Sequence, residues 1–329
     1  MEGIQILQEE KIGIYLLKQL QIKLNKFKLS ASCIFNGLVG LVVCAYCLSI
    51  APNTSFALVS NTSPKREKVT NGVLYHVGLN RDLIENAQYA ILPGDPGRVE
   101  ELAKAIGKNA KFIASHREYT SWLTYVCEKP VLVMSTGMGG PSVAIGVEEL
   151  AQLGVKNFIR VGTTGSIRDD LNIGDVVINK ASVRLEGTSS HFAPIEFPAT
   201  ADLDITLALR QAARELKIPH KVGINVSSDT FWPGQERYDC FSNYVLRRFQ
   251  GSLKEWQKLG VTNFEMESAT LFTIANVFGL RAGAINGVIA KRTESETVAS
   301  RDMYKVAEKN FQAVTKKALE ILISEEIHK

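Results

Sequence analysis

The sequence offers little cysteine chemistry. Its 329 residues include five cysteines, and three of these lie between residues 33 and 47. Cys44 and Cys47 have the CxxC spacing, but no second CxxC or histidine pair accompanies them, so a zinc site is not indicated. A disulfide-stabilised fold needs cysteines at a higher density. We therefore expect isolated thiols in apolar surroundings.

An excess of charge of one sign is also lacking. The chain has 38 Lys and Arg against 34 Asp and Glu, a net charge of +4, without a long basic run. That balance does not indicate a nucleic-acid-binding surface, but it allows a few arginines placed to bind a small anion. A glycine-rich segment at residues 135–142 has neither the GxxxxGK[ST] nor the GxGxxG order. By itself it is best explained by close packing of a helix on a sheet.

Charged residues are absent altogether from residues 29–64. The apolar run at 33–50 approaches the length of a membrane crossing, with a Lys-rich flank before it and a polar linker after it. One interpretation is a removable organelle or secretory targeting segment, which we favour, and the other is a retained membrane anchor. Either way we predict an N-terminal extension at residues 1–70 and a separate folded domain, of a cytosolic type, at residues 71–329.

From residue 75 onward, short apolar strands alternate with amphipathic helices. Strands are expected at residues 88–92, 130–135, 157–161, 176–178, 222–226 and 282–289. Helices are expected at residues 99–106, 143–153, 205–216, 269–278 and 303–323. The strand at 157–161 is expected to end at the glycine- and threonine-rich turn that follows it. This alternation predicts an α/β domain with a parallel or mixed sheet covered on both faces, and ligands bound beyond the strand ends.

Arginines follow or interrupt two of these strands. Arg160 lies inside an apolar strand, where burial is costly without a carboxylate or phosphate partner, and a guanidinium can bind phosphate through two hydrogen bonds. The alternative is an arginine on the solvent face of an edge strand. Gly94 and Arg98 belong to a turn that can either approach an anion or simply reverse the chain. Thr163 can offer its hydroxyl or N–H to the same anion.

Two later segments carry further polar chemistry. Glu265 and Glu267, two residues apart, would point the same way from an extended segment and can do acid–base work or bind sugar hydroxyls. The alternative is a pair of solvated charges. Phe231 can stack on a base, while Gln235 and Arg237 offer the donors and acceptor that suit an imide edge, unless the segment is only a structural loop.

Taken together, these segments resemble the nucleoside phosphorylase-I family, specifically its hexameric bacterial branch that acts on uridine. The likeness runs from about Tyr75 to Leu322, and the motifs occur in the family's order and spacing: HREYTSW, STGMGGPSVAIGVEEL, RVGTTGSI, RLEGTSSHFAPIEFPA, SSDTFWPGQERYD and NFEMESATL. The resemblance implies a three-layer αβα sandwich with a mixed, partly barrel-like central sheet. It also implies a homohexamer, a trimer of dimers, whose sites are shared across the dimer interface.

The resemblance further implies reversible phosphorolysis of uridine to uracil and ribose 1-phosphate in pyrimidine salvage, with deoxyuridine and thymidine as further substrates. Phosphate is then the co-substrate, and no cofactor is needed for the chemistry. Nucleic acid is not an implied partner, and a membrane would be contacted only through a retained N-terminal segment.

The family's functional positions map onto named residues of this sequence. The implied phosphate ligands are Gly94, Arg98, Arg160 and Thr163, with Arg117 from a partner subunit. The implied ribose ligands are Glu265, Met266 and Glu267, with His76 from the partner meeting the 5′-hydroxyl. The implied base ligands are Phe231, Gln235, Arg237 and Ile289, with Arg292 as a gate or outer contact. Arg237, Gln235 and Glu267 are the implied catalytic residues, and a structural potassium ion is implied at Glu118, Met138 and Ser142.

Some positions depart from the family pattern and bear on base selectivity and on the closing loop at 293–299: Tyr75, Trp232, Phe264, Ala290 and Lys291. Three alternative functions are weighed. A purine nucleoside phosphorylase would be expected to carry an aspartate near residues 234–237. A nucleosidase has no need of three phosphate arginines, and a non-catalytic nucleoside-binding or storage relative would lose charged site residues that are all present here.

Overall fold

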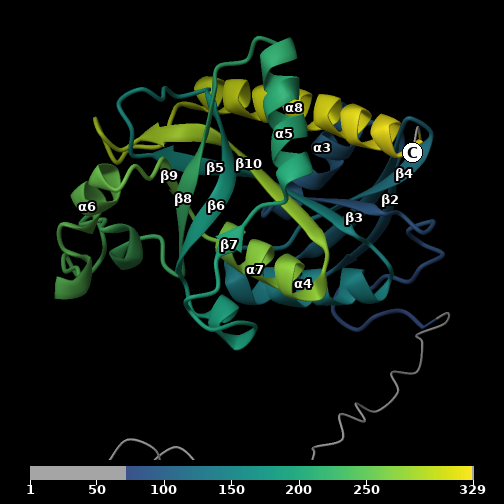
Figure 1. The fold of residues 1–329 in the computed structure, drawn as a ribbon, viewed down its shortest axis with the longest axis horizontal. Helices are drawn as coiled ribbons and strands as arrows, with labels where there is room; N and C mark the ends of the chain where they lie inside the picture. Colours follow the sequence, from purple (N-terminus) through teal and green to yellow (C-terminus); the bar gives the residue numbers. More distant parts are fainter. Residues whose placement is uncertain (1–71, 328–329) are drawn as a thin grey trace, which may run out of the picture. The chain divides into compact units, whose positions relative to one another are not determined.

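A mixed sheet runs through the computed structural model, which describes residues 72–327 (Figure 1). The predicted extension at residues 1–70, with its apolar run and Cys33, Cys44 and Cys47, lies outside the described residues. Within the described part, Cys127 and Cys240 are free thiols, as expected, but Cys127 is exposed and Cys240 is partly exposed beside Ser242, so the expected apolar surroundings are wrong for both. None of the helices between residues 72 and 327 has both the length and the apolar content that a membrane span requires.

The sheet is part open and part closed. Its open part has the order β2-β3-β4-β1-β5, in which β1 is parallel to both β4 and β5. The order then continues as β5-β10-β6-β8-β9, and the pairing of β9 with β5 closes these five strands into a ring. The expectation of a mixed, partly barrel-like sheet is therefore confirmed.

The strand bounds follow the apolar segments of the sequence. The open part comprises β1 (Tyr89–Leu92), β2 (Lys108–His116), β3 (Tyr119–Val126) and β4 (Lys129–Met134). The ring comprises β5 (Asn157–Ser166), β6 (Val176–Leu185), β8 (His220–Ser228), β9 (Asn263–Glu265) and β10 (Arg281–Lys291), and a short β7 (Ala199–Thr200) pairs with β6.

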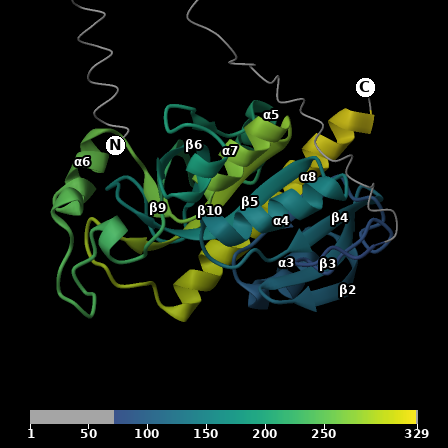
Figure 2. The ribbon, with the colours of Figure 1, turned by 90° about the horizontal axis from the view of Figure 1, so that it is seen from below.

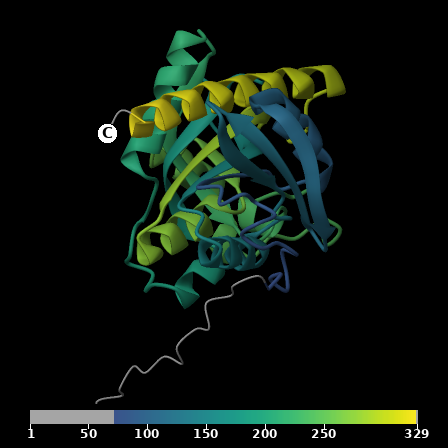
Figure 3. The ribbon, with the colours of Figure 1, turned by 90° about the vertical axis from the view of Figure 1, so that its right-hand side faces the viewer.

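Helices cover both faces of this sheet, as Figures 1 and 3 show. One face packs against α4 (Gly140–Gln152) and α7 (Ser268–Phe278), which lie in front in Figure 2. The other packs against α3 (Val99–Ile106), α5 (Leu203–Glu215) and α8 (Arg301–Ile327). A further short helix is α6 (Ser252–Lys258).

The two hydrophobic cores follow from the alternation of side chains along each strand. On β1, Ala90 and Leu92 join the core under α4 and α7, while Tyr89 and Ile91 join the core under α3, α5 and α8. On β5, Ile159 packs in the core under α3, α5 and α8. Because neighbouring side chains on a strand point to opposite faces, the side chain of Arg160 points to the α4 and α7 face. The three-layer αβα arrangement predicted from the sequence is therefore confirmed.

Two predicted strand ends are wrong, and several elements were not predicted. The strand expected at residues 176–178 is β6, which continues to Leu185 because it pairs with β8 along that length. β5 does not end before Gly162 but continues to Ser166, because residues 162–166 pair with β10 in parallel register. A side chain on Gly162 would meet Asn286 Oδ1 at 2.7 Å, so this glycine permits close packing inside a strand rather than a turn. The hairpin of β2 and β3 was missed because β2 is mostly exposed and has little apolar alternation.

Candidate active site

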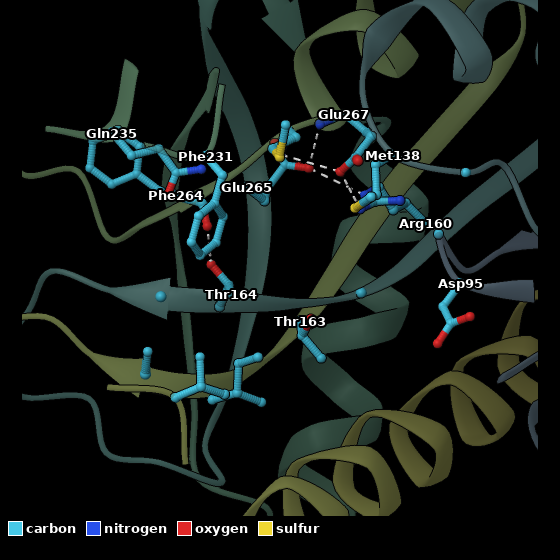
Figure 4. A pocket seen from close by; sticks show the side chains of 18 of the residues that line it. Asp95, Met138, Arg160, Thr163, Thr164, Phe231, Gln235, Phe264, Glu265 and Glu267 are labelled. Atoms are coloured by element: carbon cyan, nitrogen blue, oxygen red, sulfur yellow. Dashed lines mark hydrogen bonds and ion pairs between the residues drawn. The ribbon is translucent and has the colours of Figure 1, made fainter. Parts of the chain in front are cut away.

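A cavity of about 430 Å³ lies beyond the carboxyl ends of β1 and β4 and beside the last residues of β5, β9 and β10 (Figure 4). Its size falls in the range of small-molecule sites, and its place is the usual one for ligands in α/β sheets. It brings together most of the residues singled out in the sequence: Gly94, Arg98, Met138, Arg160, Thr163, Phe231, Gln235, Arg237, Glu265, Met266, Glu267 and Ile289.

Arg160 lies at one end of the cavity and is 6% exposed, so the edge-strand alternative is wrong. Its Nε donates to Glu265 at 3.2 Å, and its Nη2 donates to Glu267. Its Nη1 is buried without a hydrogen-bond partner among the described residues. A side chain on Gly94 would begin 3.9 Å from Nη1, so this unpaired donor lies beside the Gly94 backbone and the cavity.

Glu265 and Glu267 both reach Arg160, so the alternative of solvated charges is wrong as well. Glu265 ends β9 and is 4% exposed. Besides Arg160, it accepts hydrogen bonds from Asn225 Nδ2 at 2.7 Å, from Ser227 Oγ and from two backbone N–H groups at the start of α7. Its oxygens are therefore already occupied, and its structural effect is to hold Arg160 in place.

Glu267 has a different position, at the N-terminal end of α7. Its Oε1 accepts the backbone N–H of Gly139 at 2.7 Å, which ties it to the start of α4. Burial raises the pKa of Glu267, whereas the Arg160 guanidinium and the Gly139 N–H favour the ionised form. Glu267 is thus held at the cavity wall by a cation and a backbone donor.

The other end of the cavity is formed by the segment after β8. Gln235 is 4% exposed and Arg237 is 3% exposed, and the Arg237 guanidinium lies 4.3 Å from the centre of the Phe231 ring. Burial lowers the pKa of Arg237, and the nearby charge of Arg292 lowers it further. These three side chains line one cavity wall, so the segment does more than reverse the chain.

A carboxylate that the sequence did not indicate joins two arginines here. Glu296 accepts from Arg237 Nη1 at 2.5 Å and from Arg292 Nε and Nη2 at 2.7 and 2.9 Å. Arg292 lies behind Gly165 and over the Phe264 ring rather than in the cavity lining. The only sequence signal for this contact was the i, i+4 spacing of Arg292 and Glu296, which is common on loops and helices.

Arg98 is supported by α8, a contact that the sequence also did not indicate. Its Nε lies 3.5 Å from Glu308, and its guanidinium lies 5.2 Å from the centre of the Tyr304 ring. Burial lowers the pKa of Arg98, while the Glu308 carboxylate opposes that effect. Arg98 is therefore held in place where it lines the cavity together with Asp95.

Five predicted residues do not line the cavity: Arg292, described above, and His76, Arg117, Glu118 and Ser142. Arg117 lies in the turn between β2 and β3 and donates to the Tyr75 hydroxyl at 3.2 Å. The Nδ1 of His76 lies 2.6 Å from Glu149. Arg117 and His76 are the two residues that were predicted to act in a partner's site, and that contribution stays a prediction.

Comparisons with known proteins agree with this geometry. A model described as Phosphorylase superfamily matches residues 88–320. Uridine phosphorylase of Salmonella typhimurium is 51% identical over 249 residues, which are 76% of this chain and 98% of that protein. Uridine phosphorylase of Thermococcus kodakarensis is 42% identical over 79% of this chain and 90% of that protein. Guanosine phosphorylase of Halorubrum lacusprofundi is 36% identical over 60% of this chain and 76% of that protein.

The substitution Glu265→Ala tests the buried cluster. It removes the acceptor shared by Arg160 Nε, Asn225 and Ser227 and leaves these buried donors without it, so the free energy of unfolding should fall by about 3–5 kcal/mol. Urea denaturation followed by circular dichroism measures this. The exposed Glu255→Ala is the matched control and should change stability by less than about 0.5 kcal/mol. Equal stability of the two variants would contradict the assignment of Glu265 as the anchor of Arg160.

Proposed function

This chain belongs to the phosphorylase superfamily, and from that premise we propose that it cleaves uridine with inorganic phosphate to give uracil and ribose 1-phosphate, reversibly. The observation that carries the proposal is one cavity with an unpaired buried arginine donor at one end and a glutamine–arginine pair at the other. Relatives named uridine phosphorylase at 51% and 42% identity support the choice of base.

Phosphate binds, in this proposal, between Arg98 and Arg160, with the Gly94 backbone and Thr163 beside it. The support is the unpaired Arg160 Nη1, which an anionic oxygen would satisfy. Both arginines are already held by carboxylates on other elements, so binding phosphate requires little reorganisation. Phosphate placed here lies next to Glu267, which we assign with Met266 to the ribose hydroxyls.

Glu265 was predicted to touch ribose, and its occupied oxygens favour a different contribution. We assign it to orienting Arg160 and Glu267 rather than to binding sugar directly. Uracil is assigned to Phe231, Gln235 and Arg237, with Ile289 at the cavity wall. The Phe231 ring offers a stacking face, and the arginine and glutamine side chains offer hydrogen bonds to the imide edge. Arg292 is assigned as an outer contact that acts on Arg237 through Glu296.

The reaction breaks the bond between ribose C1′ and the base nitrogen, and its electron pair leaves with the base. A phosphate oxygen forms the new bond to C1′. Positive charge develops on the sugar and is stabilised by phosphate, as carboxylates do in glycoside hydrolysis. Negative charge develops on uracil and is stabilised by Arg237 and Gln235. For this, Arg237 donates to the base in place of Glu296, its acceptor in the structure. The proton that hydrogen phosphate loses on forming the ester balances the one that the departing uracil takes up. The reaction involves no oxidation or reduction, so the proposed chemistry needs no cofactor beyond phosphate as co-substrate.

The alternative functions have less support. The relative named guanosine phosphorylase is less similar and covers less of the chain than the relatives named for uridine. Gln235 and Arg237 stand at the base end of the cavity, where a purine enzyme was expected to carry an aspartate. A nucleosidase would not need the unpaired donor of Arg160. A non-catalytic relative would not need to retain these buried charged groups.

We also propose a homohexamer built from dimers, in which Arg117 and His76 complete the partner's site. Both side chains lie outside the cavity of their own chain and present polar groups at the surface. Arg117 would meet phosphate, and His76 would meet the ribose 5′-hydroxyl. Substrate range beyond uridine, namely deoxyuridine and thymidine, belongs to the same proposal.

A structural potassium ion is proposed at Glu118, Met138 and Ser142. Ser142 Oγ lies 3.3 Å from the Met138 carbonyl oxygen, and a side chain on Gly137 would meet both Glu118, at 3.1 Å, and Ser142 Oγ, at 3.4 Å. One carboxylate with neutral oxygens suits a hard monovalent cation, and the described residues hold no cluster of three acidic, histidine or cysteine ligands. A higher unfolding temperature in K+ than in choline at equal ionic strength would support this, and equal temperatures would contradict it.

The division of the chain is part of the proposal too. We assign residues 71–329 to the phosphorylase domain and residues 1–70 to a targeting or anchor segment. The family match begins at residue 88, and 98% of the Salmonella relative is accounted for by 76% of this chain. Fractionation of cells that produce the chain with and without residues 1–70 tests the segment, and identical distribution would contradict a targeting or anchoring role.

The central test is a phosphate-dependence assay. Purified protein is given uridine, thymidine, inosine or adenosine, each with and without phosphate, and base release is measured by chromatography. We expect uracil from uridine only when phosphate is present, together with ribose 1-phosphate. Base release without phosphate would contradict phosphorolysis, and faster release from inosine than from uridine would contradict the choice of base.

Replacement of Arg237 by alanine tests the base end. It removes one fixed donor to the departing base, so kcat for uridine should fall about 100- to 1000-fold while the assembly stays folded. The control is Arg248→Ala, an exposed arginine that lies over Phe249. Normal uridine turnover by Arg237→Ala would contradict the assignment of Arg237 to base recognition.

Mixed oligomers test the shared site. Arg117→Ala and Arg237→Ala should each be nearly inactive alone, because each lacks one side chain of every site. Co-expressed, the two variants should regain activity, since about one quarter of the sites would hold both arginines if subunits pair at random. Steady-state rates of the purified mixture measure this, and a mixture no more active than its parts would contradict a site shared between subunits.

A further inference from the structure

His76 is half exposed, yet it is fixed at several points. Its backbone N–H lies 3.2 and 3.1 Å from the two Glu149 oxygens, and its ring Nδ1 lies 2.6 Å from one of them. The next backbone N–H, of Val77, donates to Glu149 at 2.9 Å. The carbonyl of His76 accepts from His116 Nδ1 at 2.9 Å, and the Tyr75 ring packs edge-on against the imidazole. A half-exposed side chain rarely needs this much support.

Glu149 supplies most of that support from a buried position. It lies on α4 and is 9% exposed, and its two oxygens together accept from two backbone N–H groups and one ring nitrogen. An ionised carboxylate can only accept hydrogen bonds, so the His76 proton is assigned to Nδ1. In the neutral form of the ring, this tautomer leaves the lone pair on Nε2, in the way that carboxylates orient metal-binding histidines.

We propose that Glu149 is a positioning residue for the reaction: it fixes the tautomer and direction of His76, so that Nε2 accepts a hydrogen bond from the 5′-hydroxyl of the nucleoside bound in the partner's site. Glu149 itself touches no substrate. The inference rests on the proposed function and on the assignment of His76 to that hydroxyl. It adds the specific claim that a buried carboxylate on α4 determines which ring nitrogen faces the sugar.

Glu149 contacts His76 from α4, a helix whose own position is fixed. The start of the same helix is tied to Glu267 through the Gly139 N–H. Ten residues of helix separate the two points, a rise of about 15 Å. Near its start, α4 therefore holds Glu267, which is assigned to ribose in its own chain's cavity, and near its other end it orients His76.

The test compares two substrates that differ only at the 5′ carbon, uridine and 5′-deoxyuridine, with phosphate saturating. In Glu149→Gln the amide can donate to Nδ1 and move the ring proton to Nε2, which then no longer accepts. We expect kcat/KM for uridine to fall about tenfold and that for 5′-deoxyuridine to change less than about twofold. Glu215→Gln, which removes an exposed carboxylate paired with Lys317, is the matched control and should change neither value.

A second comparison separates positioning from a merely structural effect. His76→Ala should reduce the preference for uridine to the same extent, and Glu149→Gln should add little in the His76→Ala background. Glu149→Asp retracts the carboxylate from Nδ1 while keeping its charge, and it should also lower the preference, which keeps the test available if Glu149→Gln does not fold.

Equal losses on both substrates, or additive losses in the double variant, would overturn the inference. Failure of the unsubstituted protein to release uracil from either substrate would instead overturn the proposed function.

Discussion

The site depends on the buried ion cluster of Arg160, Glu265 and Glu267. One guanidinium faces two carboxylates, so the cluster alone carries no excess of positive charge with which to attract a phosphate dianion. Burial raises the pKa of Glu267, and the neighbouring charge of Glu265 raises it further, while Arg160 opposes both effects. Phosphate affinity must therefore come from further arginines added around the cluster. Arg98 in the same chain and Arg117, proposed from a partner, would supply that charge.

Under the proposed function, Arg237 would exchange its Glu296 partner for the base. Glu296 neutralises two buried arginines, and its own side chain remains 36% exposed, so its release into solvent is less costly than the burial of an unpaired arginine. A uracil that accepts from Arg237 would replace this carboxylate while Arg292 keeps it nearby. The loop that carries Glu296 also carries Val298, which lines the cavity. One segment thus carries both the carboxylate partner of Arg237 and part of the cavity wall.

Local sequence patterns predicted more of this site than of its surroundings. Arg160 could be identified because a guanidinium in an apolar strand demands a partner, and both partners proved to be the paired acids. Glu296 and the contacts of Arg98 with Glu308 and Tyr304 could not, because they depend on where separate loops and helices meet in space. The continuation of β5 through Gly162 could not be predicted either, because glycine is typical of turns. Its packing role depends on the neighbouring Asn286 of β10, which only the structure places there. The roles of His76 and Arg117 came from family resemblance and stay predictions.

The closed ring of β5, β10, β6, β8 and β9 has a consequence for how this protein could acquire new specificities. A strand in a closed ring has neighbours on both sides, so a shift of register in one strand would have to be accommodated by the others. Of the residues that line the cavity, Arg160, Thr163 and Glu265 lie on β5 and β9 within that ring, whereas Gly94 and Arg98 follow β1 outside it. Two segments outside the ring strands, 231–237 and 292–298, supply Phe231, Gln235, Arg237 and Val298 to the lining. Under the proposed function, exchange of these two segments would offer a route to cleave other nucleosides while the strands of the ring stay in place.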